Sequence, residues 1–465
     1  MLERRGSMGR SRPPAMLVAA AGLTLALLAG ACTSARSGSG GGSGERSYPR
    51  TIPQPVMLVD LPVAPESERV DIAVPTFSNP TDVTNPLFPV SRQDSVLLVG
   101  HVEGKPFRTE VTLLPNTRII EWRGQQVETL VSQYVAFLDG RIHEVAYDHY
   151  AQADDGSVWY FGEDVFNFRH GVIADTEGTW IAGQDGPPAM IMPGHPRVGD
   201  VYRPENIPGL VFEEVTVKSS GQVLNGPLGP IDGGLLVREL HDDGTYEDKT
   251  FAPGYGEFFT GGGGDVEALA MAVPTDAASG VLPPDLASMS DAAMGALDAS
   301  LAGEWKTASA RAAELTEAWK AYPSHQVPRR VGTWIEGAVE ELDEALAAPD
   351  RTGAPAAAIQ AARWLLDLHL RYRPQVEVDL ARLDLWAAQI EVDAAAGDAA
   401  AVGGDFFVLD YVRDRILAGL DATELTRLNT VLAQLQSAVI DRDLAAAADQ
   451  ARHLRDTVAG ISPMG

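Results

Sequence analysis

The stretch PTDAASGVLPPDL, residues 274–286, divides the sequence into two regions of different pattern. Before it, hydrophobic and polar residues alternate, as in FRTEVTLL at 107–114, where every second residue from Phe107 to Leu113 shares one face. After it, Ala and Leu dominate, and apolar residues recur every three or four positions, as at Leu425, Leu428, Leu432, Leu435 and Val439. Alternation is typical of a strand with one buried face, and the longer spacing is typical of an amphipathic helix. We therefore predict an α+β protein.

The β region is predicted at 91–275 and the helical bundle at 287–461, with the linker between them. Three Asp-Gly pairs separate strand-like runs, at Asp139-Gly140, Asp155-Gly156 and Asp243-Gly244. Asp-Gly supplies the positive φ angles that tight hairpin turns need. No strand-helix-strand alternation appears, so we expect an antiparallel curved sheet or half-barrel rather than a parallel sheet.

The helical region has room for six or seven helices between 287 and 460. Asp421, followed three residues later by Glu424, is a candidate N-cap and predicts that one of these helices starts there. His369 lies on an apolar helical face, where a lone histidine is more often a core residue than a metal ligand. Asp379, Trp386 and Asp393 recur every seven residues. We interpret these three residues as a helix face exposed to solvent. The alternative is that they line a polar interior of the bundle together with His369.

The composition excludes nucleic acid as a partner. The 465 residues carry a formal net charge of −28, and so acidic a surface repels polyanions. The chain has a single cysteine, Cys32, so an intrachain disulfide cannot form.

The N-terminal segment MLERRGSMGRSRPPAMLVAAAGLTLALLAGAC, residues 1–32, has four arginines before a short apolar run that ends at Ala31. This is the pattern of a signal peptide rather than of a membrane span. LLAGAC at 27–32 resembles the lipobox of bacterial lipoproteins. The resemblance implies that residues 1–31 are removed and that Cys32 carries a lipid, with fatty acids such as palmitate. It places the protein on the extracytoplasmic face of the cell membrane, anchored by that lipid. Residues 32–90 are rich in Gly, Ser and then Pro, and predict a tether.

YDHYAQADDGSVWYFGED at 147–164 is the densest stretch of aromatic and acidic residues. If Asp155-Gly156 is a two-residue loop, Gln152 pairs with Trp159, Tyr150 with Phe161, and Asp148 with Glu163. One sheet face then carries Glu144, Asp148, Tyr150, Gln152, Trp159, Phe161 and Glu163. Opposed carboxylates repel unless a proton, a cation or a basic group lies between them, so this face is a candidate ligand or cation site. In the alternative, which we favour, the aromatics are core and the carboxylates lie at a solvated edge, paired with Arg141 or Arg169.

The same run, followed by GTWIAGQDG, AMIMPGHPRVGDVYRPE and KTFAPGYGEF, resembles an uncharacterised extracytoplasmic β domain of bacterial proteins, over residues 85–272. The resemblance implies a fold and supplies no catalytic residues.

Other candidate metal ligands are Met190, Met192 and His195 in AMIMPGHP, a combination that suits Cu(I) although Met also fills core gaps by default. The chain has no nucleophile elbow, P-loop or dinucleotide fingerprint, and no cofactor is favoured. We therefore expect a non-catalytic lipoprotein of the cell envelope that binds a small ligand or a partner protein. The alternatives are a metal- or haem-binding lipoprotein, and an envelope hydrolase that uses Glu144, Asp148 or Glu163.

Overall fold

A computed structural model describes residues 61–347 and 350–464. The predicted signal peptide, Cys32 and residues 32–60 of the predicted tether lie outside the described residues. The rest of the predicted tether, residues 61–90, lies against the sheet: Ala64 and Val70 hydrogen-bond to β10 and β9, and residues 76–85 contact the β4–β5 hairpin. There, the Asp154 carboxylate accepts hydrogen bonds from the Thr76 hydroxyl at 2.7 Å and the Ser78 amide at 2.8 Å.

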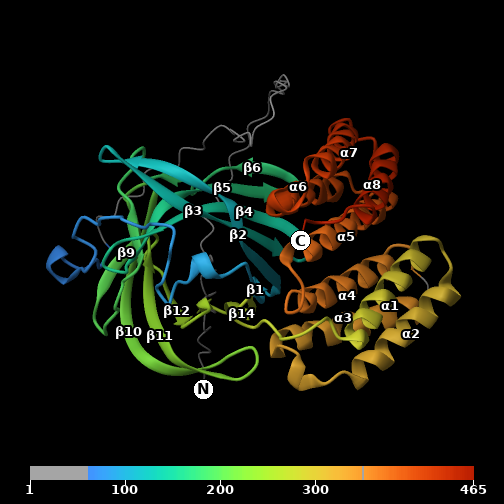
Figure 1. Ribbon diagram of the computed structural model, residues 1–465, viewed down its shortest axis with the longest axis horizontal. Coiled ribbons are helices and arrows are strands. Elements are labelled where there is room, and N and C mark those ends of the chain that lie inside the picture. The colour runs from blue at the N-terminus through green and yellow to red at the C-terminus, as the bar shows by residue number, and fades with distance from the viewer. Residues whose placement is uncertain (1–60, 348–349, 465) are drawn as a thin grey trace, which may run out of the picture.

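The sheet contains fourteen strands, and every strand pairing in it is antiparallel (Figure 1). The strands are β1 (Ser95–Val102), β2 (Lys105–Trp122), β3 (Gln125–Leu138), β4 (Arg141–Gln152), β5 (Val158–Arg169), β6 (Val172–Asp175), β7 (Trp180–Ile181), β8 (Ala189–Met192), β9 (Val201–Ile207), β10 (Val211–Asn225), β11 (Pro230–His241), β12 (Tyr246–Ala252), β13 (Gly256–Gly262) and β14 (Asp265–Val273). Their order is β6-β5-β4-β3-β2-β1-β14-β13-β12-β11-β10-β9, with β7 and β8 added beside β5. The sheet is open and strongly curved.

Eight helices follow in the described part of the chain. They are α1 (Pro284–Leu301), α2 (Trp305–Ala321), α3 (Arg329–Ala347), α4 (Gly353–His369), α5 (Gln375–Ala396), α6 (Ala399–Ile416), α7 (Ala422–Ile440) and α8 (Leu444–Ala459). The α+β fold class predicted from sequence is confirmed. The cap predicted at Asp421 is also confirmed, because its carboxylate accepts from the amides of Thr423 at 2.7 Å and Glu424 at 2.8 Å. Across the described ranges, no helix combines the length and the apolar character that a bilayer span requires.

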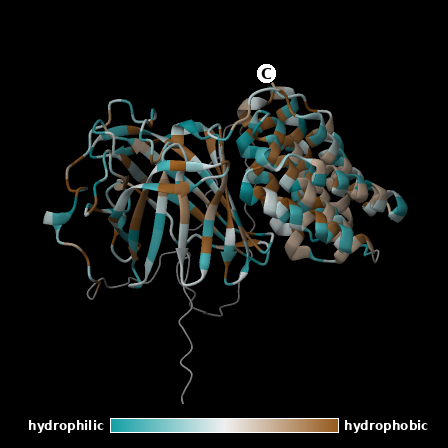
Figure 2. Cartoon of the chain, turned by 90° about the horizontal axis from the view of Figure 1, so that it is seen from below, coloured by the Kyte–Doolittle hydropathy of each residue, from teal (hydrophilic) through white to brown (hydrophobic). Residues whose placement is uncertain are grey.

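The helices all lie on one side of the sheet, and hydrophobic and hydrophilic residues interleave along the strands (Figure 2). Two hydrophobic clusters join the two halves of the fold. One contains Leu97, Val99 and Met271 of β1 and β14 together with side chains of α1–α5. The other contains Val145 and Phe166 of β4 and β5 together with side chains of α5–α8. The outer face of β1, β3, β4, β5 and β14 is therefore core, which leaves the concave face to form a separate interior.

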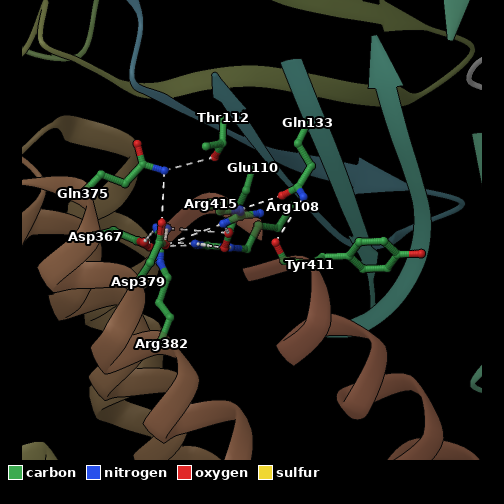
Figure 3. A network of polar contacts seen from close by, with 10 residues as sticks. All are labelled: Arg108, Glu110, Thr112, Gln133, Asp367, Gln375, Asp379, Arg382, Tyr411 and Arg415. Carbon is green, nitrogen blue, oxygen red and sulfur yellow. Dashed lines mark hydrogen bonds and ion pairs between the residues drawn. The ribbon is translucent and has the colours of Figure 1, made fainter. Parts of the chain in front are cut away.

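A network of buried charges also crosses this interface (Figure 3). Its members are Arg108 and Glu110 of β2, Asp367 of α4, Asp379 and Arg382 of α5, and Arg415 of α6. Arg108 donates to Glu110 and to Asp367 at 2.8 Å each. Arg382 donates to Asp379 at 2.8 Å and to Asp367 at 2.9 Å, and Arg415 donates to Glu110 at 2.7 Å. Three guanidinium groups thus balance three carboxylates, and this balance is what makes the burial of six charges tolerable.

The interpretation of Asp379, Trp386 and Asp393 as a solvated flank is wrong. All three are buried, with exposed fractions of 0%, 4% and 5%. Asp379 belongs to the charged network, and Trp386 stacks on Phe137 of β3 with ring centroids 5.4 Å apart. Asp393 accepts a hydrogen bond from Arg141 of β4 at 3.0 Å. The two aspartates of this stripe of α5 pair with buried or half-buried arginines of α5, α6 and β4, and do not face water.

Candidate functional site

A cavity of about 180 Å³ lies inside the curved sheet. Its lining includes apolar side chains, among them Val96, Leu98, Val111, Val215, Val237 and Phe251. Its lining also includes charged and phenolic side chains, namely Asp148, Glu213, Glu239, Glu257, Glu267, Lys249, Tyr134, Tyr150, Tyr202 and Tyr255. An apolar space with a few converging polar groups is the usual character of a small-ligand site.

The alternation of β4 explains how acidic residues come to face this space. Asp148 and Tyr150 line the cavity. Their neighbours Val145 and Tyr147 point the other way, since Val145 packs in the core with the helices and the Tyr147 hydroxyl donates to Asp414 of α6 at 2.9 Å. Side chains alternate between the two faces of a strand, so one set in β4 faces the helices and the other set faces the cavity.

The β4–β5 register agrees with the sequence prediction at one pair and differs at two. The pairing of Asp148 with Glu163 is confirmed. The predicted partners of Tyr150 and Gln152 are wrong, because Tyr150 pairs with Tyr160 and Gln152 with Val158.

Two local features explain the difference. The loop has three residues, 154–156, because the Ala153 amide donates to the Ser157 carbonyl at 2.8 Å. This shifts the register by one position, and an irregularity between Asp148 and Tyr150 shifts it back. Gly162 lies at the irregularity with φ 108°, and a Cβ there would meet the Trp180 carbonyl oxygen at 2.1 Å. The same three-residue loop occurs at 242–244, whereas Asp139-Gly140 is the two-residue turn that was predicted, with φ angles of 53° and 73°.

The interpretation of the hairpin carboxylates as a solvated edge is wrong. Asp148 is 8% exposed, and the Tyr160 hydroxyl donates to it at 2.7 Å. Neither proposed partner reaches it, since Arg141 pairs with Asp393 and Arg169 with Asp175. The other part of that interpretation is confirmed for Trp159 and Phe161, which are core residues. Their placement on a ligand-binding face was wrong, since neither lines the cavity.

Glu163 meets a carboxylate that the sequence did not suggest. It hydrogen-bonds to Glu205 of β9, and the pKa of both groups is raised well above the usual value, mainly by burial. Repulsion from Glu205 adds to the rise for Glu163, and repulsion from Glu213 adds to the rise for Glu205. β9 ends the strand order, and β5 lies next to its other end. A carboxyl pair that shares a proton therefore connects the two ends of the open sheet.

A mixed cluster of charges lies on β10, β11 and β12. Lys249 pairs with Glu239 at 2.6 Å, and His241 lies 3.6 Å from both Glu213 and Glu247. Burial alone would lower the pKa of His241, but its hydrogen bonds with Glu213 and Glu247 raise the pKa to about 10. His241 is therefore an imidazolium at neutral pH.

Three members of this cluster have the geometry of a metal site. Potential ligand atoms of Glu239, His241 and Glu247 all lie within 4.8 Å of one another. A divalent ion there would require neutral His241 and would compete with the Lys249 ammonium group. The arrangement is better explained as a set of carboxylates that pair with two cations of the protein itself, Lys249 and His241.

Four further carboxyl groups have pKa values shifted into the neutral range, mainly because they are buried. The pKa is raised to about 7 for Asp148 and Glu267, and to about 8 for Glu144 and Glu239. Such groups exchange a proton easily near pH 7, so they can donate or accept hydrogen bonds or ionise when a cation arrives.

The weaker metal candidates are not brought together. Met190 and Met192 are packed in the sheet core, whereas His195 is exposed. His369 is buried on α4, where its Nε2 lies 2.9 Å from the Ser290 hydroxyl, and burial lowers its pKa to about 4. This is a satisfied core histidine, as the apolar helical face indicated.

Sequence reasoning missed Tyr160, Glu205, Glu213, Glu239, Lys249 and Glu267. A signal was present, because several of these charged residues interrupt short apolar runs, as in LLVREL at 235–240 and DVEALA at 265–270. A charge at an inward position of a strand marks a polar interior.

Comparison with known proteins found no protein-family model and no curated sequence that matches the chain.

The proton shared by Glu163 and Glu205 leads to a prediction for the Glu163→Gln variant. The folded pKa of Glu163 is raised, so its contribution to stability is full below the unfolded pKa and is lost as pH rises through the folded pKa. A glutamine needs no proton from solvent and can still donate to Glu205. We expect the variant to be more stable than the parent by about 1–2 kcal/mol at pH 8, with a smaller difference at pH 5. Thermal melts at both pH values measure this.

A lower melting temperature of Glu163→Gln at pH 8 would contradict the shared proton and would indicate that Glu163 holds a cation. Melting of the parent in the presence of a chelator distinguishes the two cases, since only a bound divalent ion makes melting sensitive to the chelator.

Proposed function

We propose that the protein is a lipid-anchored, extracytoplasmic lipoprotein that binds a small molecule with a cationic group in the cavity of its curved sheet. The cavity itself is the observation that carries the proposal. Five carboxyl groups line it, those of Asp148, Glu213, Glu239, Glu257 and Glu267, and Lys249 is the one cationic side chain among its lining residues. The apolar walls would hold the body of the ligand and the acidic residues its charge.

The state of the carboxyl groups favours a cation. Asp148 and Glu267 have raised pKa values because ionisation in a buried site is unfavourable. A bound cation would lower those pKa values and favour the ionised form, so binding a cation releases protons. The cavity is therefore weakly charged when empty and becomes a strong anionic site as the ligand enters.

The three carboxyl groups that the sequence offered for a hydrolase, Glu144, Asp148 and Glu163, do not supply both an acid and a base. Acid-base catalysis by two carboxyl groups needs one that is protonated and one that is ionised at the working pH. Glu144, Asp148 and Glu163 all have raised pKa values, so this set contains no group that is held ionised. Binding without catalysis is the simpler use of the site.

Calorimetric titration with n-butylammonium tests the proposal. We expect binding at pH 8 that weakens at pH 6, where protons occupy the carboxyl groups, and no binding of n-butanol. Asp148→Asn should weaken binding at least tenfold, because it removes a charge and leaves the shape intact. Asp232→Asn, at an exposed position of β11, is the matched control and should bind as the parent does.

Equal affinity of the parent and Asp148→Asn, or equal binding of the amine and the alcohol, would contradict the proposal. Native mass spectrometry of the protein purified from its host membranes would show directly whether a small molecule is retained.

A further inference from the structure

The charged residues that line the cavity of the curved sheet fall into two groups on different strands. Glu213, Glu239 and Lys249 belong to β10, β11 and β12, which are neighbours in the strand order and lie together in the sheet (Figure 1). Asp148 and Glu267 belong to β4 and β14, with β3, β2 and β1 between them in the strand order. The two groups differ in whether the protein itself supplies a cation.

The group on β10–β12 is electrically balanced. Its cations are Lys249, whose ammonium group lies 2.6 Å from Glu239, and His241, which lies 3.6 Å from both Glu213 and Glu247. Glu213 and Glu239 hydrogen-bond to each other, and burial together with the charge of Glu213 raises the pKa of Glu239 to about 8. These two carboxyl groups therefore hold one proton at neutral pH. The three glutamates then carry two negative charges, which the two cations neutralise, and we call this set the paired group.

Lys249 is a permanent cation in the wall of the cavity. Its side chain is 17% exposed. Burial alone would lower the pKa of Lys249, but Glu239 and three further glutamates raise that pKa well above its usual value. The ammonium group therefore keeps its charge at neutral pH, whether or not a ligand is present.

Asp148 and Glu267 accept hydrogen bonds from neutral hydroxyl groups, and we call them the unpaired group. The Tyr160 hydroxyl donates to Asp148 at 2.7 Å, and the Thr109 hydroxyl donates to Glu267. Within residues 61–347 and 350–464, neither carboxyl group forms an ion pair with a basic side chain. Burial raises the pKa of both to about 7, and for Glu267 the Thr109 hydroxyl and the charge of Lys249 offset only part of the rise.

Tyr134 indicates that the two members of the unpaired group act on the same part of the cavity. Its side chain lines the cavity, and β3, which carries it, is the neighbour of β4. Burial raises the pKa of Tyr134 well above its usual value, and the negative charges of Glu267 and Asp148 both add to the rise. One phenol thus lies within electrostatic reach of both carboxyl groups, and a single ammonium group beside it would interact with both.

We propose that the cationic group of the ligand binds between Asp148 and Glu267, and that Lys249 restricts the cavity to ligands with one cationic group. The inference rests on the proposed function and adds to it the position and the number of the ligand's charges. A second ammonium group would lie against the apolar walls, where it loses its hydration, or beside the paired group, where Lys249 repels it and the charges are already balanced.

Calorimetric titration of the parent with n-butylammonium and with 1,4-diaminobutane at pH 8 tests the number of charges. The two ligands have the same carbon chain, and the second carries an ammonium group at each end, because alkylamines like that of lysine are protonated at this pH. We expect the parent to bind n-butylammonium at least tenfold more tightly than the diamine.

Lys249→Met removes the internal cation and keeps a long apolar side chain. The paired group then has one negative charge in excess, which the second ammonium group of 1,4-diaminobutane can neutralise. We expect the preference to reverse, so that the diamine binds at least tenfold more tightly than n-butylammonium. Lys249→Arg keeps the charge and should keep the preference of the parent. Lys218→Met, at an exposed position of β10, is the matched control and should bind both ligands as the parent does.

Glu267→Gln and Glu239→Gln test the position of the charge, and they do so even if Lys249→Met fails to fold. Both residues line the cavity and are buried, with exposed fractions of 8% and 2%. Glu267→Gln should weaken binding of n-butylammonium at least tenfold, because it removes one of the two negative charges that hold the ligand. Glu239→Gln should weaken it no more than threefold, because the glutamine amide can donate to Glu213 in place of the shared proton.

Failure of the proposed function and failure of this inference give different results. If neither ligand binds to the parent, the cavity does not take organic cations and both are overturned. If n-butylammonium binds, three results would each overturn this inference alone. They are equal or tighter binding of the diamine by the parent, the parent's preference in Lys249→Met, and equal losses of n-butylammonium affinity in the two glutamine variants.

Discussion

Replacement of Glu110 by glutamine is expected to lower the free energy of unfolding by about 3–5 kcal/mol. Glu110 is 5% exposed and accepts hydrogen bonds from Arg108 and from Arg415, while Arg382 lies 3.7 Å away. Burial alone would raise the pKa of Glu110, but Arg382, Arg108 and Arg415 lower that pKa well below its usual value and keep the carboxyl ionised. Glutamine has nearly the same shape, so the cost comes from three arginines that are left with two carboxylates.

Urea denaturation measures this effect, with Glu317→Gln as the control. Glu317 pairs with Lys320 on the surface of α2, where both side chains are mostly exposed. Loss of such a pair costs less than about 1 kcal/mol. The double variant Glu110→Gln with Arg415→Met should be more stable than the sum of the two single effects implies, because the charges balance again. A loss below about 1 kcal/mol for Glu110→Gln would show that the network does not hold the helices on the sheet.

Replacement of Cys32 by serine is expected to abolish membrane retention. The expectation rests on the LLAGAC sequence at 27–32, which resembles a lipobox, and on Cys32 being the single thiol of the chain. Each buried methylene of an acyl chain contributes about 0.8 kcal/mol to membrane binding, so two chains anchor a protein firmly and none leaves it free. A serine hydroxyl does not accept the diacylglycerol, so the protein should either leave the membrane or remain with its signal peptide uncleaved.

Fractionation of cells that produce the parent or the variant, with mass determination of the mature N-terminus, checks this. The parent should lose residues 1–31 and partition with the membrane. Processing and membrane retention of Cys32→Ser at the level of the parent would rule out the lipid anchor. The titration of the cavity with n-butylammonium does not depend on this result.

In α5 the sequence predicted the helix correctly but predicted the surroundings of its charged residues wrongly. α5 lies within residues 287–461, where the spacing of apolar residues predicted helices correctly. The same analysis assigned Asp379 to water, because an acidic residue on a helix is usually solvated. The structure buries it completely, beside arginines contributed by its own helix and by α6.

The hairpin at 147–164 shows the same division. Alternation and the Asp-Gly pair identified two strands and paired Asp148 with Glu163 correctly. They did not reveal that the loop has three residues or that the sheet curves until Glu205 of β9 reaches Glu163. Curvature accumulates over many strands, so no short window of sequence contains it.

The sequence by itself thus determined that strands come first and helices follow, that the change falls near 274–286, and that one helix starts at Asp421, although it indicated six or seven helices where the described residues form eight. These features depend on periodicity and on turn and cap residues within a few positions of one another. Only the tertiary structure decided which sheet face meets the helices and which carboxyl groups share a proton. Arg108 meets Asp367 across 259 positions of the chain, and such a contact forms because burial of one charge requires another, wherever in the sequence it lies.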